Sequence, residues 1–332
     1  MKKISSRSNS QPLDVDPQTA SQAQISQQPG QANPTGIANI PNQIHYLNAK
    51  RKLNVNIMLF GENGLGKTGF INHVLGSPIF VDDVVENNKD SDALIRVRRQ
   101  ELEENGTSVL LSLVDLPEFG FNLNKRNAGK AALAYLEDQF VKNLLEDSKH
   151  RRQRNVFESN DSRTHSVLYF HNPCATRLSN LDLELIKKMN QVANVIIIVA
   201  KGDTLLRHEY NRIRGHIREQ LEGTPIFNDG NEPFLVVNGA DLSVPNPARN
   251  YFWGSIKIAP NSQNGTSMQF NTITNLLFKN FLPELILKTE DKYESWRVSV
   301  LHKMNVSEEE WKEPADVLNR LATQIQNLKL YA

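Results

Sequence analysis

Short, almost wholly apolar runs recur along the chain and give the clearest structural signal in it. These runs are Ile57–Phe60, Val109–Val114, Val167–Phe170, Val195–Val199 and Phe234–Val237. Runs this uniform are typical of strands buried on both faces of a parallel sheet, because a half-exposed strand would alternate apolar and polar residues. The pattern therefore predicts a central sheet built from these segments.

Longer segments with apolar residues at helical spacing separate the runs. The best of them covers residues 129–147, and its apolar face consists of Ala131, Leu133, Leu136, Phe140 and Leu144. Further helices are expected at residues 181–189, 207–221 and 270–288, the last with a kink at Pro283. Strands that alternate with helices predict an α/β fold with a mainly parallel sheet flanked by helices.

The two ends of the chain differ from this central part. Residues 1–35 are rich in Ser, Gln, Asn and Pro and contain little to bury, so we expect a disordered arm there. Near the other end, Leu318, Leu321, Ile325 and Leu328 have heptad spacing for barely two heptads. This spacing favours equally a short coiled coil and a helix that packs on the main domain.

Composition limits the partners and the compartment. Lys and Arg total 38 against 37 Asp and Glu, so charge gives no global support for nucleic-acid binding, and we expect no nucleic-acid partner. The single cysteine, Cys174, favours a reducing compartment. The sequence has no apolar run of about 18 residues and no signal-peptide core, so we expect a soluble intracellular protein. Lys50, Arg51 and Lys52 are a possible contact with an acidic membrane, although such a run is more often simply solvated.

The segment after the run Ile57–Phe60 has the form G-x-x-x-x-G-K-T and precedes a helical pattern. A glycine-rich turn in this position holds phosphate on backbone N–H groups at a helix N-terminus. Its lysine would reach the β- and γ-phosphates, and its threonine hydroxyl would bind a Mg²⁺ ion that bridges them. We therefore predict that a nucleotide contacts Gly61, Glu62, Asn63, Gly64, Leu65, Gly66, Lys67 and Thr68.

Asp115 follows the run Val109–Val114 and is expected to hold the same Mg²⁺ ion through water, so the predicted metal residues are Thr68 and Asp115. Three residues later a hydrolysing GTPase has a glycine whose N–H contacts the γ-phosphate. Here that nucleotide-contacting position is Glu118, whose charge repels a triphosphate. The switch threonine is also missing, since no threonine lies between Thr68 and Thr107. We predict little or no GTP hydrolysis and assign no catalytic residue.

The run Val195–Val199 leads into the sequence Ala-Lys-Gly-Asp-Thr. In GTPases an aspartate at this strand end accepts both the N1–H and the exocyclic N2–H of guanine, while the lysine stem lies along the base. Adenine offers no such pair of donors. Lys201 and Asp203 are therefore predicted to contact the base and to select GTP or GDP, and Thr204 beside them is counted among the predicted nucleotide-binding residues.

Two more segments complete a recognisable set. Gly36–His45 has the sequence GIANIPNQIH, and Arg249–Gly254 has the sequence RNYFWG. Together with the phosphate loop and Ala-Lys-Gly-Asp, and in this order, they resemble septins, and the resemblance covers Gly36 to about Leu301. It implies a filament-forming cytoskeletal protein that binds GTP or GDP and assembles with other septins through alternating nucleotide-side and terminal-side interfaces.

The resemblance also implies roles for further residues. The base-side loop would contain Asn238, in place of a usual glycine, and Gly239, and Arg249 would lie near the base. The nucleotide-side interface would include Trp253, with His165 and Thr204 near or across it. The other interface would consist of the helix from Phe270 and the segment before Ile57.

The expected function is a guanine-nucleotide-binding scaffold that assembles into hetero-oligomers or filaments at membranes during cell division or sporulation. Its expected location is the cytoplasm, in septin structures at the division site or at a developing membrane. We expect a disordered arm at residues 1–35, a septin-type GTP-binding domain at 36–301 and a short helical tail at 302–332. Two alternatives stay open, namely a slowly cycling GTPase and a nucleotide-free pseudo-GTPase that acts only as a binding module.

Overall fold

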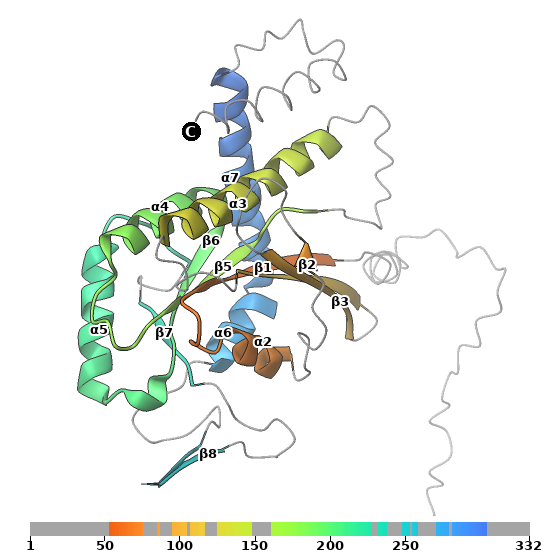
Figure 1. Ribbon diagram of the computed structural model, residues 1–332. Coiled ribbons are helices and arrows are strands. Elements are labelled where there is room, and N and C mark those ends of the chain that lie inside the picture. The colour runs from red at the N-terminus through yellow and green to blue at the C-terminus, as the bar shows by residue number, and fades with distance from the viewer. Residues whose placement is uncertain are drawn as a thin grey trace, which may run out of the picture. The chain divides into compact units, whose positions relative to one another are not determined.

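A seven-stranded sheet with the strand order β2-β3-β4-β1-β5-β6-β7 forms the centre of the computed structural model (Figure 1). The parallel strands are β1 (Leu53–Gly61), β4 (Thr107–Asp115), β5 (Ser166–His171), β6 (Asn194–Val199) and β7 (Phe234–Leu235). The sheet continues with antiparallel pairing through β3 (Ile95–Glu104) and β2 (Val85–Glu86). A separate hairpin consists of β8 (Ala248–Tyr251) and β9 (Gly254–Lys257).

The structure describes residues 53–75, 85–86, 95–104, 107–116, 125–147, 161–227, 232–237, 248–252, 254–257, 270–278 and 281–303. All of these residues belong to one unit of the chain, Tyr46–Ala332. The expected arm at residues 1–35 and nearly all of the expected tail lie outside the described residues. The division into an arm, a main domain and a tail therefore stays a prediction.

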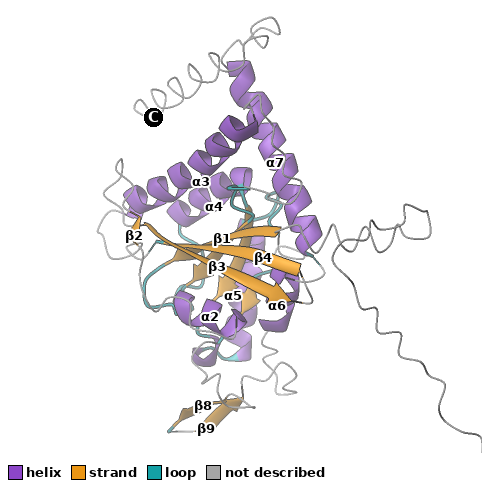
Figure 2. Ribbon diagram, turned by 90° about the vertical axis from the view of Figure 1, so that its right-hand side faces the viewer, coloured by secondary structure: helices purple, strands orange, loops and turns teal. Residues whose placement is uncertain are grey.

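Helices cover both faces of the sheet. One face carries α3 (Lys125–Asp147), α4 (Asn180–Val192) and α5 (Arg207–Gln220), and the other carries α2 (Lys67–Leu75) and α6 (Phe270–Phe278). Figure 2 shows α3 and α4 on one side of the strands and α2 and α6 on the other. The helix α7 (Leu282–Lys303) packs against α4 and α6. In the described part of the chain, none of the helices has the length and apolar character needed to cross a membrane.

Strand β1 divides the interior into two apolar cores. Its residues Met58 and Phe60 belong to the core under α3, α4 and α5, whereas Ile57 and Leu59 belong to the core under α2 and α6. All four side chains are fully buried. A strand with a core on each face has no solvent-exposed side, which explains why its apolar run shows no alternation with polar residues.

The predicted fold class is confirmed, because the sheet is mainly parallel and has helices on both faces. The single kinked helix predicted at residues 270–288 is wrong, since this stretch contains the end-to-end helices α6 and α7. Pro283 is the second residue of α7 and not the site of a kink. Proline suits the first turn of a helix, where a backbone N–H would have no helical partner.

Candidate functional site

The loop from Gly61 to Gly66 joins the end of β1 to the start of α2, as the sequence predicts. Gly61 pairs with Phe170 of β5 and has φ 141°, and a Cβ atom there would lie 2.6 Å from the Phe170 carbonyl oxygen. Gly64 and Gly66 have φ 77° and 82°, which are left-handed values that favour glycine. The loop therefore depends on glycine at Gly61, where it leaves β1 close beside β5, and at the two left-handed positions Gly64 and Gly66.

Lys67 begins α2 and is only 5% exposed. Its Nζ donates hydrogen bonds to the carbonyl oxygens of Gly61, at 2.9 Å, and Glu62, at 3.1 Å. Burial lowers the pKa of Lys67, and the nearby charge of Asp115 acts in the opposite direction. The ammonium group thus lies beneath the phosphate loop. Burial disfavours its charged form, and a bound phosphate chain would favour that form by placing negative charge beside it.

The loop that follows β5 supports the phosphate loop from the side. Asn172 Nδ2 donates a hydrogen bond of 2.8 Å to Glu62 Oε2, and Asn63 Oδ1 accepts a bond of 2.8 Å from the Gly64 amide. The Glu62 side chain therefore points toward Asn172. Sequence reasoning missed Asn172, although its position directly after a parallel strand beside β1 is a usable signal for a ligand-side residue.

Thr68 and Asp115 supply oxygen atoms of the kind that Mg²⁺ prefers. Thr68 lies in the first turn of α2, and Asp115 is the last residue of β4, which pairs directly with β1. Asp115 is 6% exposed, and its charge acts on Lys67. A hydroxyl and a buried carboxylate next to a phosphate loop fit a metal ion held partly through nucleotide oxygens.

The predicted base-binding segment lies at the same edge of the sheet. It follows β6 and forms the short 3-10 helix η2 (Gly202–Thr204). Lys201 has φ 50°, an uncommon left-handed value for a residue with a side chain, and such strain is concentrated at functional sites. Thr204 is exposed at this turn, and its hydroxyl donates to the Lys201 carbonyl oxygen at 2.8 Å.

A side chain of the β8–β9 hairpin contacts this segment. The Tyr251 hydroxyl donates a hydrogen bond to the carboxylate of Asp203. This contact joins residues 48 positions apart and was not predicted, although Tyr251 belongs to the RNYFWG segment. A carboxylate has capacity for several hydrogen bonds, so Tyr251 can hold Asp203 while a base donates to the remaining lone pairs.

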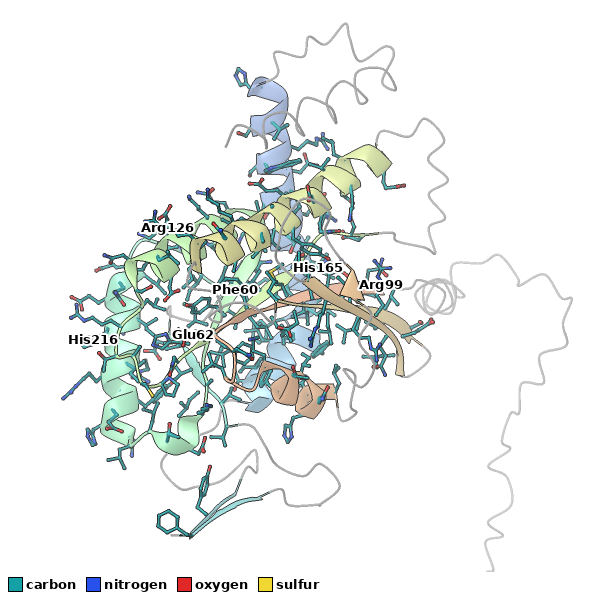
Figure 3. All side chains as sticks on the ribbon, in the orientation of Figure 1. Phe60, Glu62, Arg99, Arg126, His165 and His216 are labelled. Atoms are coloured by element: carbon teal, nitrogen blue, oxygen red, sulfur yellow. The ribbon has the colours of Figure 1, made fainter. Side chains whose placement is uncertain are left out.

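His165 lies at the opposite edge of the sheet from the phosphate loop (Figure 3). It directly precedes β5, it is 1% exposed, and its Nδ1 accepts a hydrogen bond of 3.0 Å from the Asn56 amide. Because β1 and β5 are parallel, residues before β5 cannot share an edge with the loop after β1. The expectation that His165 lies near the nucleotide-side interface is therefore wrong.

Several predicted residues lie outside the described part of the chain. These are Glu118, Asn238, Gly239 and Trp253. For Arg249 the structure describes the backbone, which belongs to β8, but not the side chain. The predicted contacts of these residues with a nucleotide or with a partner stay predictions.

Comparison with known proteins decides which family shares this arrangement. The family model named Septin matches residues 51–229, which is more than half of the chain. The chain belongs to the septin family. The match spans the phosphate loop, Asp115 and the Ala-Lys-Gly-Asp segment, so the septin resemblance found in the sequence is confirmed.

Two curated relatives and one solved structure agree with this assignment. The septin is 29% identical over 306 residues to "Cell division control protein 3" of Candida albicans, with 82% of this chain and 71% of that protein covered. It is 28% identical over 286 residues to "Sporulation-regulated protein 3" of Saccharomyces cerevisiae, with 80% of this chain and 53% of that protein covered. This septin thus spans about half the length of the second relative.

The solved structure is similar in fold. It is the septin GTPase domain from Chlamydomonas reinhardtii, and it matches with a TM-score of 0.56 at 22% sequence identity. The match covers 74% of this chain and 99% of that domain. The GTPase-like fold predicted for this septin is confirmed by that likeness.

Proposed function

We propose that this septin binds GTP or GDP at the carboxyl edge of its parallel sheet. The observation that supports the proposal is the meeting of three distant segments at that edge: the phosphate loop after β1, Asp115 at the end of β4, and Asp203 after β6. In open α/β sheets, ligands bind outside the carboxyl ends of the strands. The phosphate loop and Lys67 would hold the phosphates, and Asp203 would hold the base.

The proposed contacts follow the chemistry of each group. The eight residues from Gly61 to Thr68 surround the phosphates, and Thr68 and Asp115 hold Mg²⁺ together with phosphate oxygens. Lys201, Asp203 and Thr204 contact the guanine side, joined by Asn238, Gly239 and Arg249. A carboxylate that accepts two N–H groups favours guanine over adenine, because adenine has no matching donor pair.

We also propose that this septin functions in assemblies with other septins, as hetero-oligomers or filaments. At the end of β8, Phe252 is fully exposed, and it is followed by Trp253. Adjacent large aromatic residues on a hairpin are costly to leave in water and are typical anchors of protein interfaces. The names of the relatives, a cell division control protein and a sporulation-regulated protein, support a cytoskeletal role at a division site or a developing membrane.

The membrane contact and the main domain belong to the same proposal. Lys50, Arg51 and Lys52 would add attraction to an acidic membrane surface of about 1 kcal/mol each. The GTP-binding domain would extend over residues 36–301, between a disordered arm and a short helical tail. No nucleic-acid partner is proposed, because the numbers of basic and acidic residues nearly balance.

The first test identifies the nucleotide that copurifies with the full chain. The protein is denatured, and the released nucleotide is identified by ion-exchange chromatography. We expect GTP or GDP, and Asp203→Asn should lose it while circular dichroism stays unchanged. Asp291→Asn, an exposed substitution on α7, is the matched control and should retain the nucleotide. The assignment of Asp203 to guanine recognition would be wrong if the released nucleotide were ATP, or if the Asp203→Asn variant retained as much GTP or GDP as the wild type.

The second test measures hydrolysis. We propose that GTP turnover is very slow or absent, because Glu118 replaces the usual glycine and no switch threonine is present between Thr68 and Thr107. Glu118→Gly removes a negative charge beside the γ-phosphate position, so it should raise the affinity for GTP relative to GDP. Single-turnover hydrolysis and the GTP-to-GDP affinity ratio are measured on both proteins. An unchanged ratio would mean that Glu118 does not face the phosphates.

A further inference from the structure

A cavity lies beneath α3, at the end of β1 opposite the phosphate loop. It is a cavity of about 280 Å³ between the sheet, α3 and the segment that precedes β5. Its sheet residues come from the amino-terminal half of β1, from β4 and from β3, and its helix residues are Tyr135 and Gln139. The volume is at the small end of the range for small-molecule sites, which suits a ligand the size of one ring.

The strand register places a polar row across the floor of this cavity. Arg99 of β3 pairs with Ser112 of β4, and Ser112 pairs with Asn56 of β1, so the three side chains lie side by side on one face. The next row toward the carboxyl edge is apolar and contains Val97 and Val114. The cavity therefore joins a polar strip to an apolar wall, which is the surface expected for a ligand with one polar and one apolar end.

Two of the lining side chains have hydrogen-bonding capacity that the described residues do not use. Gln139 is only 6% exposed, yet its side-chain amide makes no hydrogen bond with any residue in the described ranges. Arg99 likewise makes no ion pair with the described residues; it lines the cavity and is exposed to solvent, and Figure 3 labels it on β3. Both side chains can therefore donate hydrogen bonds to a ligand in the cavity, the Gln139 amide through its NH₂ group and Arg99 through its guanidinium.

The charged side chains of the lining are one cation, Arg99, and one anion, Asp161. The acidic side chain in the lining is Asp161, and its carboxylate is already occupied by Arg163, through bonds of 2.8 Å and 2.9 Å. Arg99 is thus the lining charge that remains uncompensated among the described residues. One planar guanidinium matches the two oxygens of a carboxylate, whereas a phosphate dianion would call for a second cation.

We propose that this cavity binds a small carboxylic acid with an apolar or aromatic body. The carboxylate pairs with Arg99 and accepts hydrogen bonds from Ser112 and the Gln139 amide. The apolar body lies against Val97 and Val114. This site is separate from the proposed nucleotide site at the carboxyl edge of the sheet. The carboxylic-acid proposal can therefore be tested independently of the nucleotide proposal.

The test uses the full chain with isotope-labelled Leu and Val methyl groups and sodium benzoate as the probe. Val97, Leu110 and Val114 line the cavity and serve as site-specific reporters in methyl NMR spectra. We expect saturable shifts of these three residues with millimolar affinity, the range for a ligand of about nine non-hydrogen atoms. Benzyl alcohol, which has the same ring without the charge, should bind at least fivefold more weakly.

Substitutions test whether the cavity recognises the carboxylate or only the apolar ring of the probe. Arg99→Gln should weaken benzoate binding at least fivefold, and Gln139→Leu, which has a similar volume, should weaken it about threefold. Arg98→Gln is the matched control, because Arg98 is the neighbouring residue on β3 and its side chain leaves the opposite face of the sheet. The proposal is overturned if the reporters show no saturable shift up to about 20 mM benzoate. It is equally overturned if benzoate and benzyl alcohol bind alike, or if Arg99→Gln binds benzoate as the wild type does.

Discussion

Arg163 lies outside the two apolar cores, yet its replacement should cost this fold several kcal/mol, on the order of 3–5. Its side chain is 10% exposed, and it donates to both oxygens of Asp161, at 2.9 Å and 2.8 Å, and to Glu290 of α7. Its guanidinium also lies 5.0 Å from the centre of the Tyr293 ring. One side chain therefore joins the segment before β5 to the helix α7.

Arg163→Met keeps an apolar stem against Tyr293 but leaves the Asp161 carboxylate, 12% exposed, without its main partner. Removing one member of a buried ion pair costs about 3–5 kcal/mol, because the remaining charge stays buried and uncompensated. That is a large part of the roughly 5–15 kcal/mol that stabilises a typical domain. The bond to Glu290 adds little, since Glu290 is 48% exposed.

The assay is urea unfolding of the full chain at pH 7, followed by circular dichroism. Arg297→Met is the matched control on α7, because Arg297 pairs with Glu294 at 2.8 Å in an exposed position, and it should cost well under about 1 kcal/mol. Adding Asp161→Asn to Arg163→Met should recover part of the loss, since the orphaned charge is gone. A cost for Arg163→Met equal to that of Arg297→Met would refute the reasoning.

Acid pH gives an independent check on the same pair. Burial alone would raise the pKa of Asp161, but hydrogen bonds from His165 and Arg163 hold it well below its usual range. A depressed pKa in the folded state adds stability above the unfolded pKa of about 3.9, and this stability is lost as the pH falls further. The difference in unfolding free energy between the wild type and Arg163→Met should therefore shrink below about pH 4. A difference that stays constant there would exclude Asp161 as its origin.

Three further predictions concern other parts of the molecule. Gly61→Ala should abolish nucleotide binding and lower the melting temperature, because the new Cβ would meet the Phe170 carbonyl; Gly69→Ala, which has open space around it, is the control and should be tolerated. Tyr251→Phe should weaken GTP binding about three- to tenfold in a fluorescent-nucleotide titration, since Asp203 loses a hydrogen bond, and equal affinity would contradict that role. Burial, together with the charge of Lys288, lowers the pKa of Lys292 to about 8, so the neutral form is favoured in the folded state. Unfolding free energy should then rise between about pH 8 and pH 10.5 in the wild type but not in Lys292→Met, as measured by urea unfolding.

The phosphate loop could be predicted from sequence because all of its chemistry lies within eight consecutive residues. The strand Ile57–Phe60 and the helix after Lys67 fix its position locally, without help from distant contacts. The same holds for Asp203, which needs only the end of a buried strand. Each of these segments directly follows a predicted strand. Because the strands are parallel, the segments that follow them lie at the same edge of the sheet.

The position of His165 was also available from the sequence, because His165 precedes the run Val167–Phe170 and the sheet was expected to be mainly parallel. The septin resemblance instead implied a place near the nucleotide-side interface, which belongs to the other end of that strand. The strand β5 has six residues and is about 20 Å long, so assigning a residue to the wrong end moves it across the whole sheet. The contact between Tyr251 and Asp203 and the row of Arg99, Ser112 and Asn56 could not be deduced, because each depends on pairing between segments far apart in sequence.

The edges of the main sheet have a consequence for the contacts that this septin can make with neighbouring chains. Within the residues that the structure describes, β7 and β2 contribute two residues each, and β2 pairs with β3 at Ile95 and Arg96. The rest of β3 is rich in charged residues, with the sequence VRRQELEE. Short or highly charged edges disfavour the addition of another strand from a neighbouring chain. If this septin assembles as proposed, the described edges of its sheet favour contacts between side-chain surfaces, which can dissociate and reassemble, over strand-to-strand addition, which leads to amyloid-like fibres.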